Sequence, residues 1–243
     1  MSGHSKWATT KRQKAVVDAK RSSAFTKIAN VITIAARKGG DPEMNFSLRI
    51  AIDRARGVNM PKDNIERAIK RGTGELGGAA LEELTYEGFG PAKTGFIVEV
   101  VTDNKNRSAA DIRHLFAKNG GSLGAGGSVS WNFERKGVIR IMAEELKNKN
   151  SNHDEFELAL IDAGADDIQK EAEGWTVFTT IENLNKVKIF LDEKKITAES
   201  AAIEYVPKEE KKVSEEDKNK IEKFIEELED NEDVSNYYTD VII

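Results

Sequence analysis

Lysines and arginines near the N-terminus are the side chains whose type and spacing predict chemistry. Residues 1–21 carry six of them against a single acid, Asp18, and Trp7 is the only large aromatic residue in this segment. Cationic side chains along an arm with too little apolar content to bury a core neutralise phosphates without a fixed geometry, so we expect a flexible, basic arm. The candidate nucleic-acid contacts, which continue into the segments that follow, are Lys6, Trp7, Lys11, Arg12, Lys14, Lys20, Arg21, Lys27, Arg37, Lys38, Lys62, Lys70, Arg71 and Arg107.

The charge of the chain is divided unevenly along its length. The 243 residues have a formal net charge of −5, but residues 1–72 hold 16 Lys+Arg and 6 Asp+Glu, whereas residues 73–243 hold 21 and 36. A basic segment joined to an acidic remainder points to nucleic acid as the partner of the basic part. We favour this interpretation over a solvated basic surface without a ligand, which is the usual role of a charge run.

Three of the candidates also have an ordinary structural explanation. Trp7 can stack on an unpaired base or can dock and pin the arm to the helices. Lys62 follows Pro61 at a helix start, where free amides can bind phosphate or simply begin the helix. Arg107 follows an Asx-turn and N-cap sequence, and a cation there opposes the helix dipole. A residue that opposes its local dipole can have another task, so Arg107 is a candidate RNA contact.

The sequence lacks the residue patterns of a catalytic or metal site. It has no cysteine, which excludes disulfides, thiolate zinc sites and cysteine nucleophiles. Its three histidines, at positions 4, 114 and 153, do not have the spacing of paired ligands. The glycine-rich segment 120–127 lacks the phosphate-loop lysine, and we interpret it as a connection whose backbone approaches a partner closely. We therefore expect no enzyme, cofactor or metal; a hydrolase with a hidden site is the weakest hypothesis.

The same sequence predicts a cytoplasmic protein without membrane association. No apolar run approaches the roughly 20 residues that span a bilayer. The N-terminus has no apolar core of a secretory signal, and its first 21 residues contain only two arginines, too few for a typical mitochondrial presequence. No dimerisation element is evident, so we expect a monomer.

Hydrophobic periodicity predicts an α+β fold in three domains preceded by the arm. Helices at 22–38, after Asp41-Pro42 to 57, and 61–72 form a three-helix bundle. Strands at 84–89, 96–101 and 128–133 and a helix at 107–119 follow. The next elements are a strand at 138–142, a helix at 153–163, strands at 167–171 and 175–180, a helix at 183–193 and a strand at 197–206, in the βαββαβ order of a ferredoxin-like sandwich.

The tail, a helix at 214–230 and a strand at 235–242, cannot fold alone. We infer that it returns to complete the first α+β domain, so that the ferredoxin-like domain is an insertion. The expected organisation is an arm at 1–21, a helical bundle at 22–80, an α+β domain at 81–136 plus 208–243, and an inserted α+β domain at 137–207.

Five stretches of the chain resemble one family closely. They are GHSKW at 3–7, NMPKDNIERAI at 59–69, YEGFGP at 86–91, TDNKNR at 102–107 and the segment from Gly120 to Gly137. The chain resembles the YebC-type family, which includes mitochondrial translational activators of cytochrome oxidase. The sequence departs from the family at residues 8–14 and at Ala92-Lys93-Thr94, where many members have a glycine pair.

The resemblance implies a helical bundle and two α+β domains, one inserted in the other, and it implies two functions. One is a ribosome-associated factor that assists translation, including that of proline-rich stretches. The other is a transcriptional regulator that binds duplex DNA. We favour ribosomal RNA or mRNA on the ribosome, because the expected third helix interleaves Asp63 and Glu66 with its cations, and helix-turn-helix proteins usually bind DNA as dimers.

Overall fold

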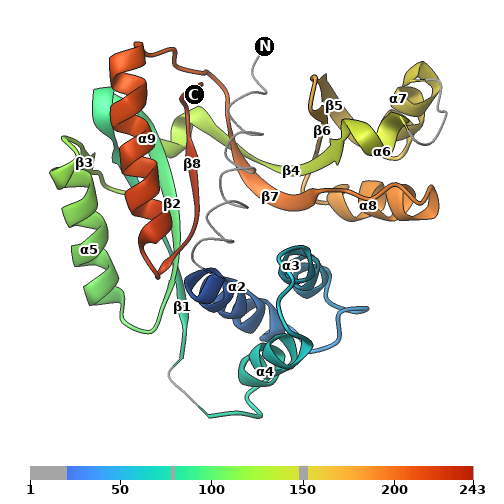
Figure 1. Ribbon diagram of the computed structural model, residues 1–243, viewed down its shortest axis with the longest axis horizontal. Helices are drawn as coiled ribbons and strands as arrows, with labels where there is room; N and C mark the ends of the chain where they lie inside the picture. The colour runs from blue at the N-terminus through green and yellow to red at the C-terminus, as the bar shows by residue number, and fades with distance from the viewer. Residues whose placement is uncertain (1–20, 78–79, 148–152, 243) are drawn as a thin grey trace. The chain divides into compact units, whose positions relative to one another are not determined.

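The computed structural model describes residues 21–77, 80–147 and 153–242 (Figure 1). The chain forms two compact units: residues 133–206 make up the inserted unit, and residues 21–132 with 207–242 make up the main unit. The α+β fold that the sequence predicts is confirmed. Among the described residues, no helix is long and apolar enough to cross a membrane.

The main unit begins with the three-helix bundle. Its helices are α2 (Arg21–Ala36), α3 (Phe46–Gly57) and α4 (Lys62–Gly72). Asn45 accepts a hydrogen bond from the amide of Leu48 at 3.1 Å, which caps α3. Pro61 is the cap residue of α4 rather than its first helical residue, one position from the prediction. The buried core consists of Ile28, Ile32, Ala36, Leu48, Ala51, Ile52, Ala55, Met60, Ile65 and Ala68.

The sheet of the main unit is completed by the C-terminal segment, as inferred from the sequence. Its strands are β1 (Glu82–Phe89), β2 (Gly95–Thr102), β3 (Ser122–Leu123) and β8 (Val234–Thr239), in the order β3-β1-β2-β8. Helices α5 (Lys105–Lys118) and α9 (Glu215–Asp230) lie side by side against it (Figure 1). Phe96, Val98 and Val100 of β2 join side chains of both helices in one core.

The opposite face of this sheet meets the helical bundle. Because side chains alternate along a strand, Ile97, Glu99 and Val101 point away from α5 and α9. Helix α2 contacts β2 and β8, and Arg54 of α3 donates to Asn236 of β8 at 3.1 Å. The side-chain amide of Asn236 in turn donates to Glu99 at 2.9 Å. Bundle and sheet therefore form a single compact body.

The inserted unit has the ferredoxin-like order of strands and helices. Its strand order is β5-β6-β4-β7, and β6 pairs antiparallel with both β4 and β5. The sequence did not predict the short helix α6, because five residues are too few for a periodicity signal. The elements are β4 (Phe133–Met142), α6 (Ala143–Lys147), α7 (His153–Asp162), β5 (Ala165–Lys170), β6 (Gly174–Thr179), α8 (Leu184–Glu193) and β7 (Ser200–Pro207).

One predicted element is wrong. Residues 128–133 do not form a strand; Ser130–Asn132 form a 3₁₀ turn, and β4 begins at Phe133. The carboxylate of Glu87 accepts the amides of Gly127, Val129 and Ser130. These amides are therefore not available to a strand ladder, which explains why an apolar and aromatic segment does not extend a sheet.

The turn between β1 and β2 contains Ala92 and Lys93 where many family members have a glycine pair. Both residues have a φ of 56°, in the left-handed region that favours glycine. Lys211 donates its amine to the carbonyls of Ala92 and Lys93, at 2.8 Å and 3.0 Å. The turn therefore keeps its geometry without glycine, held in part by a lysine from the C-terminal segment.

Candidate nucleic-acid interface

Helices α3 and α4 are joined by a short turn, which is the order of elements in a helix-turn-helix. The turn comprises residues 58–61; Asn59 has a φ of 56°, which asparagine tolerates better than most residues. Met60 is buried beneath it and donates its amide to the carbonyl of Ala55 at 2.9 Å. The local sequence thus fixes the direction in which α4 presents its outer face.

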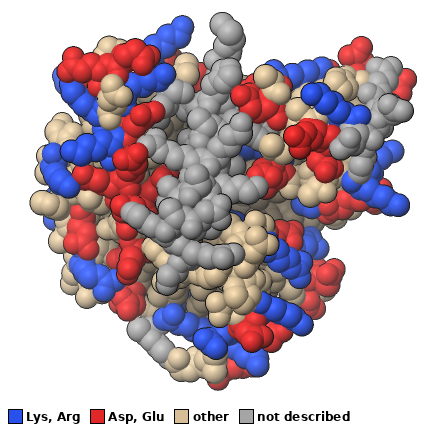
Figure 2. Space-filling model, viewed as in Figure 1, with Lys and Arg blue, Asp and Glu red and all other residues tan. Residues whose placement is uncertain are grey.

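That outer face carries both signs of charge. Its exposed charged residues are Lys62, Asp63, Glu66, Arg67 and Lys70. The amine of Lys62 lies 3.5 Å from the carboxylate of Glu66. On the face shown in Figure 2, basic and acidic side chains are likewise interspersed over the bundle. The helix can contact phosphates at its cations, but its carboxylates oppose entry into a groove lined by phosphates.

Lys27 lies where the bundle meets the rest of the main unit. Its amine donates to the main-chain carbonyl of Glu229, near the end of α9. Burial lowers the pKa of Lys27 to about 8; the charge of Glu229 opposes this effect, and Arg54 adds to it. This position favours a role in holding the bundle against the sheet, and the predicted nucleic-acid contact at Lys27 stays a prediction.

Arg37 and Lys38 lie at the end of α2. Both residues are exposed, and one guanidinium nitrogen of Arg37 donates to the carbonyl of Leu81. This hydrogen bond ties the segment that precedes β1 to the bundle. Because a guanidinium has five N–H donors, Arg37 keeps others for a ligand.

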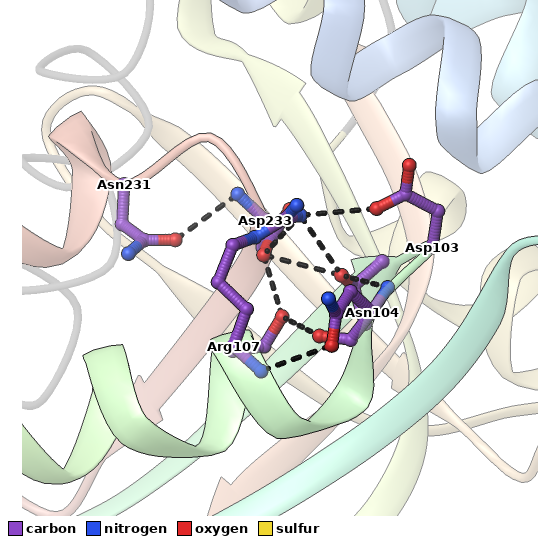
Figure 3. Close-up of polar contacts among 7 residues, drawn as sticks. Asp103, Asn104, Arg107, Asn231 and Asp233 are labelled. Carbon is purple, nitrogen blue, oxygen red and sulfur yellow. Dashed lines mark hydrogen bonds and ion pairs between the residues drawn. The ribbon is translucent and has the colours of Figure 1, made fainter.

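Arg107 is held in a polar network at the start of α5 (Figure 3). Its Nη2 lies 3.1 Å from both carboxylate oxygens of Asp233 and 3.1 Å from Asp103. Asn104 accepts the amide of Arg107 at 3.1 Å and caps the helix. Hydrogen bonding to Asp233, followed by its charge, raises the pKa of Arg107 further above its ordinary value. Two carboxylates around one guanidinium do not make a cationic phosphate site.

Asp233 is the member of this network that the sequence did not reveal. Besides Arg107 it accepts hydrogen bonds from the hydroxyls of Ser108 and Thr102. It lies 126 residues beyond Arg107 in the chain, and only the return of the C-terminal segment brings the two together. The signal that could have found it is the unfavourable cation in the first turn of α5, which calls for a compensating acid.

The structure therefore divides the candidates into three groups. Lys38, Lys62 and Lys70 are exposed, and Arg71 is half-buried. Lys27, Arg37 and Arg107 make hydrogen bonds inside the main unit. The candidates whose placement or side chain lies outside the described residues are Lys6, Trp7, Lys11, Arg12, Lys14, Lys20 and Arg21.

Comparisons with known proteins cover nearly the whole chain. Residues 5–75 match the N-terminal domain of the TACO1/YebC protein, and residues 81–241 match the second and third domain of TACO1/YebC. The chain belongs to the TACO1/YebC family. A crystal structure of a conserved hypothetical protein from Aquifex aeolicus has a TM-score of 0.82 and 39% sequence identity to the chain, over 93% of this chain and 91% of that one.

Curated relatives in this family are similar over their full length. A probable transcriptional regulatory protein of Caldanaerobacter subterraneus subsp. tengcongensis is 48% identical over 99% of this chain and 98% of its own. A relative with the same description in Chlorobaculum tepidum is 49% identical over 99% of this chain and 95% of its own. The resemblance seen in the sequence motifs is thus confirmed.

Proposed function

We propose that this protein regulates gene expression by binding ribosomal RNA or mRNA on the translating ribosome, without making or breaking bonds itself. The single observation that carries the proposal is the charge division: residues 1–72 are strongly basic, and the remainder is strongly acidic. In this proposal the arm at 1–21 and the bundle at 22–80 bind RNA. The acidic α+β domains, at 81–136 with 208–243 and at 137–207, face basic ribosomal proteins.

The distribution of charge favours a target that contains both RNA and basic protein over nucleic acid alone. The residues that surround the amine of Lys27 include Glu229, Asp230 and Glu232 near the end of α9. A long duplex lying along the bundle would approach these carboxylates, whereas a local RNA element beside a basic protein would meet charge of the right sign on each side. The contribution to translation is then positioning of bound groups, and passage through proline-rich sequences is the step that we propose it assists.

Binding of duplex DNA is the second candidate function. It is favoured by the short turn between helices α3 and α4, and by the description of the relatives as probable transcriptional regulatory proteins. The carboxylates of Asp63 and Glu66 on the outer face of α4 weigh against it. Cytoplasmic location and a monomeric state belong to both proposals.

Sedimentation of cell lysate through a sucrose gradient tests the first proposal. We expect the full chain to travel with ribosomal particles at about 50 mM salt and to be released by about 200 mM, because neutralised phosphates make binding steeply salt-dependent. Deleting residues 1–21 should return it to the top of the gradient. The matched control is a full-length variant with Lys6, Lys11, Arg12 and Lys14 changed to Gln. It removes the charge of the arm but keeps its length, so it separates the two effects of the deletion.

The two functions give opposite outcomes. If the intact protein stays at the top at low salt but retards a duplex DNA probe with a sequence preference, the DNA function replaces the ribosomal one. A purified translation reaction with and without a run of proline codons tests the finer claim. The full chain should raise the yield of the proline-rich product and leave the control product unchanged.

A further inference from the structure

Trp131 is an unusual residue because a large apolar ring faces solvent. It lies in the loop between β3 and β4, and 67% of its surface is exposed. Its indole N–H donates to the carbonyl of Ser128 at 3.1 Å, so the ring is tied to its own loop while its apolar surface stays free. Tryptophan is among the side chains that gain most from burial, so a ring that its own hydrogen bond holds at the surface is a candidate contact for a partner.

The loop that carries Trp131 is held from below by Glu87 of β1. The Glu87 carboxylate accepts the amides of Gly127 at 2.8 Å and of Val129 and Ser130 at 2.9 Å each. Burial opposes the charged form of this carboxylate, but the three amides outweigh burial and lower its pKa below the ordinary value. The anchor is therefore ionised at neutral pH, and Gly127 has the φ of +88° that this arrangement requires.

The chain on the other side of Trp131 is fixed as well. The side-chain amide of Asn132 donates to the carbonyl of Glu209 at 2.9 Å and accepts its amide at 3.0 Å. Lys208 donates its amine to the carbonyl of Trp131 at 2.9 Å. Both neighbours of the tryptophan are thus immobilised, which lowers the entropy lost when a ligand stacks on the ring.

The surroundings of the ring indicate the chemistry of its ligand. Gly126 and Gly127 have nothing within 4 Å of the position of a side chain, so a partner can approach their backbone. Lys208 is exposed, and its amine lies at the main-chain carbonyl of Trp131. An apolar protein partner would call for further apolar side chains, but the loop from Gly124 to Ser130 supplies mainly glycine and serine.

We propose that Trp131 is a stacking platform for one unpaired base of an RNA strand, with Lys208 neutralising a neighbouring phosphate and the glycine loop 124–127 admitting the strand. A flat ring, a cation and bare backbone are the elements with which proteins bind single strands. This site lies in the loop between β3 and β4, outside the bundle. It rests on the proposed function only in taking RNA as its ligand.

Fluorescence anisotropy with the full-length protein tests the site. The probes are a labelled 12-nucleotide oligo(U) strand and a blunt-ended RNA stem of the same length that is fully paired and has no loop. We expect Trp131→Ala to weaken oligo(U) binding by about 5- to 150-fold, the range for loss of one stacked base. The paired stem should bind with unchanged affinity. Trp131→Phe should keep most of the affinity because it keeps a ring.

Two further variants and a fluorescence measurement sharpen the result. Leu158→Ala, which replaces a similarly exposed side chain of α7 in the inserted unit, should leave both affinities unchanged. Lys208→Ala should reduce the salt dependence of oligo(U) binding by about one phosphate. In a Trp7→Phe background, oligo(U) should quench tryptophan fluorescence, and the further change Trp131→Phe should abolish this quenching, because the remaining Trp175 is buried. A ring with a purely structural role would show no quenching by oligo(U) in that background.

The two proposals fail in different ways. A wild-type protein that binds neither RNA removes the RNA function and this site with it. RNA binding that Trp131→Ala leaves unchanged, or weakens equally for strand and stem, overturns the stacking site and leaves the RNA function intact. Deletion of residues 1–21 separates the contributions, because it should weaken both probes.

Discussion

Each of the two units contains a four-stranded sheet, but the two sheets are built from differently arranged parts of the sequence. The inserted unit builds its four-stranded sheet from the continuous segment 133–207, whereas the sheet of the main unit needs strands from Glu82 through Thr239. Its central strand β2 pairs with β8 more than 130 residues later. Contacts between such distant segments carry a larger loop-closure cost. The core of the main unit therefore depends on contacts between segments that lie far apart in the chain.

Removal of a core ring from the returning segment should have the largest effect. Phe224 of α9 is fully buried, and its ring centroid lies 5.0 Å from that of Phe96 and 4.9 Å from that of Phe116. We expect Phe224→Ala to lower the free energy of unfolding of the main unit by about 3–5 kcal/mol.

Urea denaturation can measure this for each unit separately. Trp175 is buried in the inserted unit, and it is the sole tryptophan in a variant with Trp7 and Trp131 changed to Phe. In that background its transition should stay in place when Phe224→Ala shifts the loss of helical circular dichroism. A common shift of both signals would mean that the units unfold together. The difference in how the two sheets are connected would then not make their stabilities independent.

The polar link between Arg107 and Asp233 comes next in size. Asp233→Ala leaves Arg107, Ser108 and Thr102 without their shared acceptor, and we expect a loss of about 1–3 kcal/mol in the main unit. Asp103→Ala is the matched control. It removes the exposed carboxylate on the same guanidinium, and an exposed pair contributes about 0–1 kcal/mol. Equal losses in the two variants would show that the C-terminal segment is not held by Asp233.

Lys27 should give the main unit a characteristic pH dependence. Its pKa falls from 10.5 to about 8 on folding, so between these pH values the unfolded chain binds more protons than the folded one. Stability should therefore rise from about pH 8 to pH 10.5, by no more than about 1.4 kcal/mol per pH unit.

Thermal unfolding of the wild type and Lys27→Met across this range isolates the effect. The difference between the two proteins should grow with pH in favour of the wild type, while Lys38→Met, at an exposed position, should run parallel to the wild type. Parallel curves for Lys27→Met would mean that the amine is not desolvated between the bundle and the sheet.

The turn between β1 and β2 should give the smallest effect. Ala92→Gly relieves a left-handed backbone at a residue with a side chain, but it also loosens the unfolded chain. We expect a gain of up to about 1 kcal/mol in the main unit, visible as a small rise in its denaturation midpoint. Ala110→Gly, at an exposed position inside α5, is the control and should lose a similar amount.

The sequence predicts best what is local. Helical spacing at Ile28, Ile32 and Ala36 fixes α2 to within two residues at either end, and the nearly continuous apolar run from Phe96 identifies β2 as the central strand. The insertion also follows from the sequence, because a lone helix and strand after Pro207 need a partner.

What the sequence does not predict depends on residues far apart along the chain. The carboxylate of Glu87 accepts hydrogen bonds from the amides of residues some 40 positions later. Because of these bonds, the segment predicted as a strand forms a 3₁₀ turn. In the sequence Lys27 is one more cation in a basic stretch, yet its amine donates a hydrogen bond to a carbonyl 202 residues away. Charge patterns identify which side chains can meet phosphate, but only tertiary structure shows which of them are already engaged.

The hydrogen bonds of Asn132 have a consequence for how this architecture can change in evolution. They close the base of the insertion, since Lys208 also donates its amide to the carbonyl of Asn132 at 2.7 Å. The points at which the chain leaves and re-enters the main unit therefore lie side by side. The segment between them can be regarded as an exchangeable insertion. A module of another length in place of residues 133–206 would change the entropy of loop closure by about 0.6 kcal/mol for each doubling of length. The main unit is in this sense an acceptor domain, because its own core does not determine which module is inserted at this point.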